Sequence, residues 1–261
     1  MGSAILNSWY KFLPKKYTVC IVETSSSRRL SIKKKYKKYT VLPKIPKKWI
    51  GEYIFLAIKP QNFITAAEDI NSCRIETNFF ISIMAGLQTD YLKKKLKTSS
   101  NIVRIMPNIA TEVGKGMTCI FTKNKLNNNN ISQLNKIFSP MGEVEWIKKE
   151  FLVDAVTALS GSGPAYFFLI IQLMSKISEE LGFNKAMSRK IILQTALGSL
   201  EMIKKEKDLD KLINYVASQG GTTEAALKIF SSGKNNLEEI LKKGIFAAKN
   251  RSNELSKRLK I

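Results

Sequence analysis

Two glycine-rich segments in the second half of the chain carry the residue types of an anion-binding site. Residues 218–223 read SQGGTT and lead directly into EAALKIF, which has the period of a helix. A helix N-terminus offers free backbone N–H groups and the positive end of the helix dipole, and Ser and Thr hydroxyls add donors. Residues 159–166 read LSGSGPAY, in which Gly161 and Gly163 permit a close approach of the backbone to another group. A small carboxylate or a phosphate fits such loops, although each loop alone is also a usual turn with a helix cap.

Three loops in the first half follow apolar runs that have the pattern of strands. They read KPQ at residues 59–61, SIMAGL at 82–87 and MPNIATEVGKG at 106–116. In open α/β sheets, ligands bind outside the carboxyl ends of the strands. We therefore expect the three loops to converge on one edge of a sheet. The alternative is three ordinary connections between strands and helices.

The inventory of reactive side chains excludes several mechanisms. None of the 261 residues is a histidine, which removes imidazole bases, Ser-His-Asp nucleophiles and His-ligated zinc. The three cysteines, at positions 20, 73 and 119, are far apart and form no CxxC pair. We expect reduced thiols of a cytoplasmic protein, with neither a disulfide framework nor a metal site.

The net charge of +22 is concentrated in residues 28–48, which contain no acid. A basic stretch of this kind is one mark of a nucleic-acid interface. Lysine and asparagine are frequent along the whole chain, however, and no nucleic-acid-binding motif accompanies the stretch, so we expect no specific nucleic-acid partner. The longest apolar stretch, at 165–171, is far shorter than the roughly 20 residues that span a bilayer, and residues 1–10 lack the pattern of a signal peptide. We expect no membrane association.

The chain divides near residue 150. Residues 1–150 alternate apolar strands with helices, which predicts an α/β domain with a parallel sheet covered on both faces. Residues 151–261 have only helical periods and predict an all-α domain. The helix expected at 165–181 is apolar nearly all round and must be buried on every side, so we expect a second copy of the chain to cover it. The alternative is a helix at the centre of a monomeric bundle. The expected strands are 18–22, 54–58, 79–84, 102–106 and 117–121, and the expected helices of the second half are 165–181, 185–205, 209–217, 223–230 and 236–257, with Asn184 and Thr222 as N-caps.

Five segments, in order and at matching spacing, resemble pyrroline-5-carboxylate reductases over essentially the whole chain. They are FLAIKPQ (55–61), SIMAGL (82–87), RIMPNIATEVGKGMT (104–118), DAVTALSGSGPAYFF (154–168) and VASQGGTTEAAL (216–227). The resemblance implies a Rossmann-type domain followed by a helical domain that forms homodimers or larger rings of dimers. It also implies a hydride transfer from NADPH or NADH to the C=N carbon of 1-pyrroline-5-carboxylate, giving L-proline in the last step of proline biosynthesis. Such a transfer needs chiefly orientation and no histidine.

The resemblance further implies roles for individual residues. Thr223 would be the catalytic residue, hydrogen-bonded to the ring nitrogen of the substrate. The substrate carboxylate would be held by Ser218 and by the backbone of Gly220, Gly221 and Thr222. The residues that would close the substrate pocket are Thr157, Ser160, Gly161, Ser162 and Gly163, and those that would line the cofactor are Ala57, Lys59, Pro60, Ser82, Ala85 and Asn108.

The main departure from the family lies at the first residues. The family begins with a strand and a G-x-G-N-M-G turn, whereas this sequence begins MGSA, which matches the tail of that turn. Gly2 would be the last glycine, which allows close packing of helix against strand, and the first strand and the first two glycines are missing. Two interpretations stay open: a start placed at an internal methionine, or a truncated chain impaired in cofactor binding.

Smaller departures concern the substrate loop and the choice of cofactor. Gln219 and Ala110 stand where the family usually has proline, which leaves both loops less rigid. Glu23 ends the first strand of this sequence and suits the ribose 2′-hydroxyl of NAD, whereas Ser25 and the following Arg28 and Arg29 suit a 2′-phosphate. The family more often uses NADPH, which favours NADP weakly. The alternatives to the reductase are an inactive remnant that still oligomerises and a related imine or hydroxyacid reductase.

Overall fold

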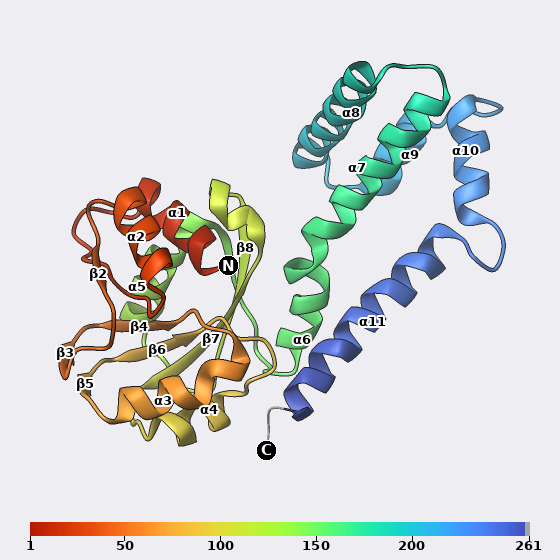
Figure 1. The fold of residues 1–261 in the computed structure, drawn as a ribbon. Coiled ribbons are helices and arrows are strands. Elements are labelled where there is room, and N and C mark those ends of the chain that lie inside the picture. The colour runs from red at the N-terminus through yellow and green to blue at the C-terminus, as the bar shows by residue number, and fades with distance from the viewer. Residues whose placement is uncertain (259–261) are drawn as a thin grey trace. The chain divides into compact units, whose positions relative to one another are not determined.

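The computed structural model describes residues 1–258 and forms two compact units (Figure 1). The first unit contains Met1–Ser162 together with the chain from Ala248, and the second contains Gly163–Ala247. Within the described residues, every strand belongs to the first unit, and the second unit is built from helices and their connections.

A five-stranded sheet forms the centre of the first unit, with the strand order β4-β6-β7-β8-β9. β4, β6 and β7 run parallel, as the apolar runs predict, but β8 is antiparallel to β7. Only residues 108–115 connect those two strands, and a parallel pair needs a crossover of about a dozen residues or more. The strands are β4 (Tyr53–Leu56), β6 (Phe79–Ser82), β7 (Asn101–Pro107), β8 (Gly116–Thr122) and β9 (Gly142–Trp146).

The sheet is interrupted on the side of β4. β1 (Cys20–Val22) pairs in parallel with β2 (Thr40–Leu42), and these two strands form a sheet of their own. Among the described residues, no ladder joins β1 to β4. In a Rossmann sheet the first strand lies between the strands that correspond to β1 and β4. No strand occupies that position among the described residues. A further short pair, β3 (Lys48–Ile50) with β5 (Arg74–Glu76), lies outside both sheets.

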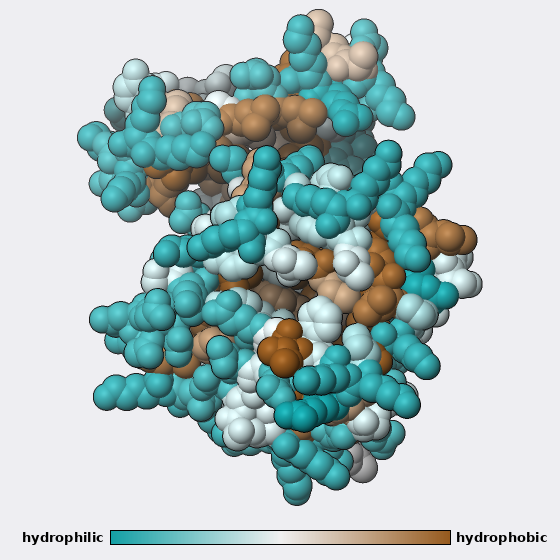
Figure 2. Space-filling view, turned by 90° about the vertical axis from the view of Figure 1, so that its left-hand side faces the viewer, coloured by the Kyte–Doolittle hydropathy of each residue, from teal (hydrophilic) through white to brown (hydrophobic). Residues whose placement is uncertain are grey.

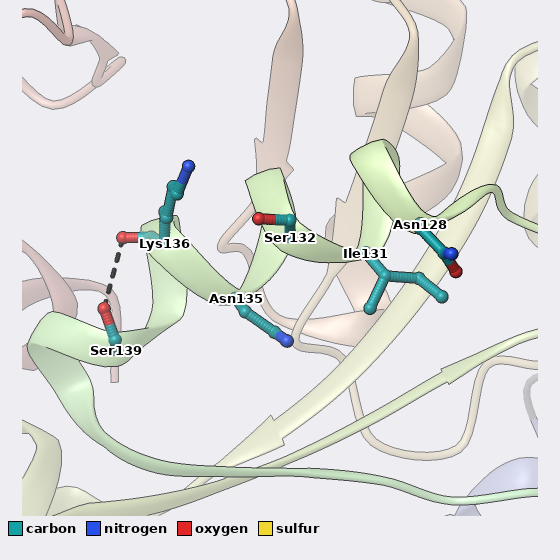
Figure 3. Close-up of a pocket in the computed structure, with 6 residues that line it drawn as sticks. All are labelled: Asn128, Ile131, Ser132, Asn135, Lys136 and Ser139. Atoms are coloured by element: carbon teal, nitrogen blue, oxygen red, sulfur yellow. Dashed lines mark hydrogen bonds between the residues drawn. The ribbon is translucent and has the colours of Figure 1, made fainter.

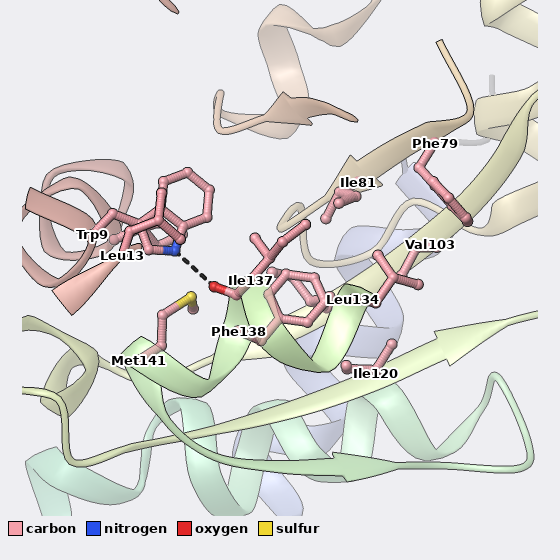
Figure 4. Close-up of a cluster of buried hydrophobic side chains, with 12 residues drawn as sticks. Trp9, Leu13, Phe79, Ile81, Val103, Ile120, Leu134, Ile137, Phe138 and Met141 are labelled. Carbon is pink, nitrogen blue, oxygen red and sulfur yellow. Dashed lines mark hydrogen bonds between the residues drawn. The ribbon is translucent and has the colours of Figure 1, made fainter. Parts of the chain in front are cut away.

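Helices cover both faces of the five-stranded sheet. β6 shows this alternation, because Phe79 and Ile81 enter one apolar cluster and Phe80 enters another. The first cluster is closed by α1 (Gly2–Phe12) and α5 (Asn128–Phe138), and Trp9 Nε1 donates a hydrogen bond of 2.9 Å to the Ile137 carbonyl within it (Figure 4). The second cluster is closed by α3 (Phe63–Asn71) and α4 (Thr89–Leu96), whereas α2 (Ser26–Lys35) buries none of its side chains.

The helices after residue 150 agree closely with the predicted periods. Asn184 caps α8, because its Oδ1 accepts a hydrogen bond of 3.0 Å from the Met187 N–H, as predicted. Thr222 is the first residue of α10 rather than its cap, which is Gly221. The helices are α6 (Leu152–Val156), α7 (Gly163–Glu180), α8 (Lys185–Lys205), α9 (Leu209–Val216), α10 (Thr222–Ser231) and α11 (Leu237–Arg258).

The long apolar helix is largely uncovered in a single copy. On α7, Phe167 and Phe168 are each 63% exposed, and Leu169, Leu173 and Ile177 are exposed as well. Figure 2 shows brown apolar side chains at the surface between hydrophilic ones. By length and composition alone, the helix Leu152–Glu180 could also span a membrane. One such helix is weak evidence for a membrane protein. An apolar stripe of this extent indicates an interaction surface.

Candidate active site

The SQGGTT segment forms the tight turn that starts α10. Gly220 has a φ of +72°, a conformation that favours glycine, and Gly221 is the N-cap of the helix. The Gly221 N–H donates to the Ser218 carbonyl at 3.0 Å, which closes the turn. Thr222 and Thr223 are the first two helical residues, whose N–H groups have no acceptor within a helix. The structure thus brings together all five residues predicted for the substrate carboxylate and the ring nitrogen.

An acidic side chain already reaches into this turn. Glu224 Oε2 accepts a hydrogen bond of 2.5 Å from the Gly220 N–H, and Glu224 Oε1 lies 3.3 Å from Lys228 Nζ. The Glu224 carboxylate therefore already accepts from the Gly220 N–H, which is one of the donors expected to bind the substrate. The sequence analysis did not single out Glu224, although an acid in the first turn of a helix after a glycine pair is a recognisable signal.

The predicted cofactor residues of the first unit follow strands that end at one edge of the sheet. Because β4, β6 and β7 are parallel, the loops that begin at Ala57, Ile83 and Asn108 leave from the same side. Gly2, the first residue of α1, packs there as well: a Cβ on Gly2 would lie 3.4 Å from the Ala57 Cβ. The structure thus brings Gly2 and Ala57 together at the carboxyl edge.

The other residues of these loops are held in place by local bonds. Lys59 precedes the 3₁₀ turn Pro60–Asn62, and its carbonyl accepts from the Asn62 N–H at 2.9 Å. Ser82 is buried at the end of β6, and its Oγ accepts from the Met84 N–H at 3.2 Å. Ala85 packs against a small apolar cluster of Met106, Phe121 and Val153, with Val156 at its margin. Local hydrogen bonds and apolar contacts thus shape the backbone at this edge.

Asn108 joins the sheet to the LSGSG segment. Its Oδ1 accepts from the Ala110 N–H at 3.2 Å, and its Nδ2 lies 3.4 Å from Ser160 Oγ. Residues Thr157–Gly161 form a π-helical turn rather than a glycine loop, with the Ser162 N–H donating to the Thr157 carbonyl at 2.9 Å. π-Helical turns are frequent at functional sites. The predicted residues Asn108 and Ser160 thus lie together.

Glycines and hydroxyls within the π-helical segment complete this side of the site. A Cβ on Gly161 would lie 3.7 Å from Met106 Sδ, so the turn rests on the end of β7. Thr157 Oγ1 donates to the Val153 carbonyl at 2.7 Å. Gly163 is the buried first residue of α7, and Pro164 stands in its first turn as predicted. Residues 157–161 and 163–164 are helical, whereas the two glycines had suggested a loop.

The loop after β1 is arranged around an arginine. Glu23 Oε1 accepts from the Ser25 N–H at 2.9 Å, so its carboxylate turns back into the loop. Arg29 Nη1 donates to the Glu23 and Thr24 carbonyls at 2.9 and 2.6 Å. Ser25 is the N-cap of α2, and its Oγ lies 3.1 Å from Ser27 Oγ. Hydroxyls, a guanidinium and a helix N-terminus thus meet where the predicted dinucleotide ribose would lie.

Other features of the first unit carry no comparable chemistry. A hollow of about 390 Å³ runs along the outer surface of α5, and none of the predicted site residues lines it (Figure 3). Within residues 1–258, no group of three or more acidic or cysteine side chains is arranged to hold a metal ion. The three cysteines are free thiols, and burial raises the pKa values of Cys20 and Cys119 above the ordinary value.

A buried charged residue, Arg104, and its partly buried partner Glu150 escaped the sequence analysis. Arg104 lies in the apolar strand β7 with its side chain only 4% exposed, and its Nη1 lies 2.9 Å from Glu150 Oε1. A charge inside an apolar strand must find a partner, so the IVRIM run signals a buried ion pair. The partner is 46 residues away in sequence, and the pattern gives no means of identifying it.

Fold and loops together have the plan of a dinucleotide-binding protein, with a Rossmann-type α/β part and a helical part. Residues 150–255 match the family model described as pyrroline-5-carboxylate reductase dimerisation. A pyrroline-5-carboxylate reductase of Vibrio alginolyticus is 31% identical over 89% of this chain and 86% of its own, and that of Pseudomonas aeruginosa is 33% identical over 80% and 76%. The chain belongs to the pyrroline-5-carboxylate reductase family and is an oxidoreductase.

Solved structures of the family have the same fold. A pyrroline-5-carboxylate reductase of Coxiella burnetii superposes with a TM-score of 0.84 at 30% identity, covering 98% of this chain and 94% of its own. A pyrroline carboxylate reductase of Plasmodium falciparum, solved with NADP bound, gives a TM-score of 0.81 at 25% identity with the same coverage. These likenesses confirm the predicted fold class, a Rossmann-type domain followed by a helical dimerisation domain.

Proposed function

We propose that this chain reduces 1-pyrroline-5-carboxylate to L-proline, the last step of proline biosynthesis, in the cytoplasm. The observation that carries the proposal is the SQGGTT turn, which places Ser218, the Gly220–Thr222 backbone and the Thr223 hydroxyl around one helix N-terminus. A carboxylate next to a C=N group uses both the amide donors and the hydroxyl. The curated relatives carry the name of this activity.

Within the proposal, each residue has a limited task. The N–H groups of the turn and the Ser218 hydroxyl hold the carboxylate of the substrate. The Thr223 hydroxyl hydrogen-bonds the ring nitrogen and orients the C=N group. When bound, the nicotinamide supplies the hydride that the C=N carbon receives, and the nitrogen takes its proton from solvent. The residues Thr157 and Ser160–Gly163 line the substrate pocket.

The cofactor in this proposal is a nicotinamide dinucleotide, and NADP is favoured over NAD. Ala57, Lys59, Pro60, Ser82, Ala85 and Asn108 share one sheet edge, with Gly2 beside Ala57. Glu23 is engaged by the Ser25 N–H, while Arg29 crosses the same loop and Arg28 stands beside it. Hydroxyls and guanidinium groups in this arrangement suit the 2′-phosphate of NADP. A free carboxylate, which would suit the 2′-hydroxyl of NAD, is not offered there, because Glu23 is already engaged. The NADP-bound structure of a relative supports the same choice.

The proposal divides the chain into an α/β domain at residues 1–150 and a helical domain at residues 151–261. The helical domain would form a homodimer. The family model that matches residues 150–255 is described as a dimerisation domain, and the exposed apolar residues of α7 offer a surface for it. The partner would be a second copy of the chain, and larger rings of dimers are compatible with such a unit.

The decisive experiment is the oxidation of NADPH and of NADH that depends on 1-pyrroline-5-carboxylate. It compares the chain as printed with a version preceded by an apolar strand and Gly-x-Gly-Asn. We expect turnover with NADPH above that with NADH. Among the described residues, no strand joins β1 to β4, and the added segment would supply both a strand for that position and a glycine turn for the pyrophosphate, so the extended version should bind the cofactor more tightly. Intact dimers with no turnover in either version would favour an oligomerising remnant.

A further inference from the structure

The carboxylate of Glu150 is the centre of a partly buried set of hydrogen bonds. Its Oε1 accepts from Arg104 Nη1 at 2.9 Å and from the Thr89 N–H at 2.7 Å. Its Oε2 accepts from Thr89 Oγ1 at 3.0 Å. The side chain of Glu150 is 13% exposed, that of Arg104 is 4% exposed, and Thr89 is buried. Three donors thus fix both oxygens of one carboxylate.

Each partner belongs to a segment that bears proposed site residues. Thr89 is the first residue of α4 and follows the loop that contains Ala85. Arg104 lies on β7, four residues before Asn108. The Glu150 carbonyl accepts from the Val153 N–H at 3.0 Å, so the same residue also holds the turn that precedes α6, which leads into the π-helical turn. One side chain therefore ties together three separate segments of the site.

The apolar contacts between these segments are less directional. Ala85, Met106, Val153 and Val156 share a cluster, which brings the loop, β7 and α6 close together without setting their rotation. Hydrogen bonds to a carboxylate do set it, because each donor must lie along its bond to the acceptor oxygen. Lys123 Nζ lies 3.9 Å from Glu150 Oε2 and adds a further charge partner for the carboxylate.

We propose that Glu150 is a positioning residue of the reductase. Its carboxylate holds the Ala85 loop, the Asn108 end of β7 and the Ser160 turn in the arrangement that sets the nicotinamide against the substrate. In this proposal Glu150 acts through Thr89, Arg104 and the turn before α6. The inference rests on the proposed function, because holding these three segments in place matters for catalysis only if they bind the cofactor and the substrate.

The first test is Glu150→Gln, which keeps the size of the side chain but turns an NH₂ group toward one of the donors. We expect kcat to fall about tenfold or more, because a small misplacement of reacting groups is costly. The KM for NADPH should stay within about threefold, since a shift in the relative placement of groups affects the reacting geometry more than cofactor binding. The matched control is Asp90→Asn, which breaks the neighbouring Lys123–Asp90 ion pair at the surface and should leave kcat unchanged.

A second variant separates positioning from loss of folding. Arg104→Met with Glu150→Met removes both charges together, so neither remains buried without a partner. We expect this protein to fold and to show the low kcat of Glu150→Gln. Wild-type kcat in a folded double variant would overturn the inference, as would equal kcat in Glu150→Gln and Asp90→Asn.

Amide hydrogen exchange without ligands gives a readout that is independent of activity. In Glu150→Gln, residues 83–89 and 152–161 should exchange about tenfold faster than in the wild type, since the acceptor of the Thr89 N–H is weakened. Asp90→Asn should not show this change. If the wild type fails to reduce 1-pyrroline-5-carboxylate, the proposed function fails, and the exchange rates still decide the positioning role. Equal exchange in the two variants would overturn it.

Discussion

Asn108 and Ser160 lie side by side although 52 residues separate them, with Asn108 Nδ2 at 3.4 Å from Ser160 Oγ. The contact connects the end of β7 to the π-helical turn. It joins a residue predicted to line the cofactor to one predicted to line the substrate. The amide oxygen of Asn108 caps a 3₁₀ turn by accepting from the Ala110 N–H.

Asn108→Ala should therefore lose stability and activity together. Loss of the cap should lower the free energy of unfolding by about 1 kcal/mol. Loss of the Ser160 contact should lower kcat/KM about tenfold or more. The matched control is Asn127→Ala, because Asn127 caps α5 in the same way, through the Asn130 N–H at 2.8 Å. Urea unfolding and steady-state kinetics would separate the two effects, and equal activity in both variants would remove Asn108 from the site.

Thr223→Ala should lower kcat by about tenfold to a hundredfold, because the C=N group loses the hydroxyl that orients it. The folded state should be unaffected, since Thr223 lies in an accessible first turn of α10. Thr222→Ala is the control: Thr222 is exposed and only its backbone is assigned to the substrate. Turnover and thermal unfolding of the two variants give the comparison. An unchanged rate in Thr223→Ala would exclude the hydroxyl from the mechanism.

Gly220→Ala should weaken substrate binding through the backbone. The φ of +72° costs a residue with a Cβ about 1–2 kcal/mol, and relaxation would turn the N–H away from the substrate carboxylate. We expect KM for the substrate to rise about tenfold. Gly233→Ala provides a matched control, with a φ of +77° and open space around its Cβ position. Both variants should lose similar stability in urea unfolding; a similar KM in both would place the anion site elsewhere.

Glu224→Gln should improve substrate affinity. The carboxylate accepts from the Gly220 N–H and repels an incoming carboxylate, so its neutralisation should lower KM about threefold at low ionic strength. The difference should shrink as salt is added, because salt screens the repulsion. Glu201→Gln, which removes an exposed acid paired with Lys204, should leave KM unchanged. A rise in KM for Glu224→Gln would mean that the carboxylate supports the turn rather than competing with the substrate.

Local patterns predicted much of the fold. The period of residues 185–205 gave the bounds of α8 correctly, and the apolar runs located β4, β6, β7 and β8. Short polar strands such as β3, with the sequence KWI, have no pattern that separates them from a loop. The π-helical turn was missed because one extra residue in a helix scarcely changes an apolar period, and glycine suggested a loop.

The site was predictable where it depends on one segment. The SQGGTT turn is local, and its residues lie together as expected. The Arg104–Glu150 pair is not local, since a strand and the start of α6 form it from distant parts of the sequence. Glu224 was within reach of sequence reasoning, because an acid at the third residue of a helix can accept from the turn before it.

The break between β1 and β4 gives the first unit an unusual attachment of its N-terminal part. Backbone ladders do not cross this break among the described residues, so α1 makes the connection. Trp9 packs edge-on against Phe55 of β4, and Val19 joins the same cluster, while Tyr36 donates to Asn7 Oδ1 at 2.5 Å. Apolar contacts of this kind weaken on cooling, whereas the ladders of the five-stranded sheet do not depend on them in the same way. We therefore expect the β1–β2 part to loosen before the five-stranded sheet on cooling, and cold inactivation on ice to begin there.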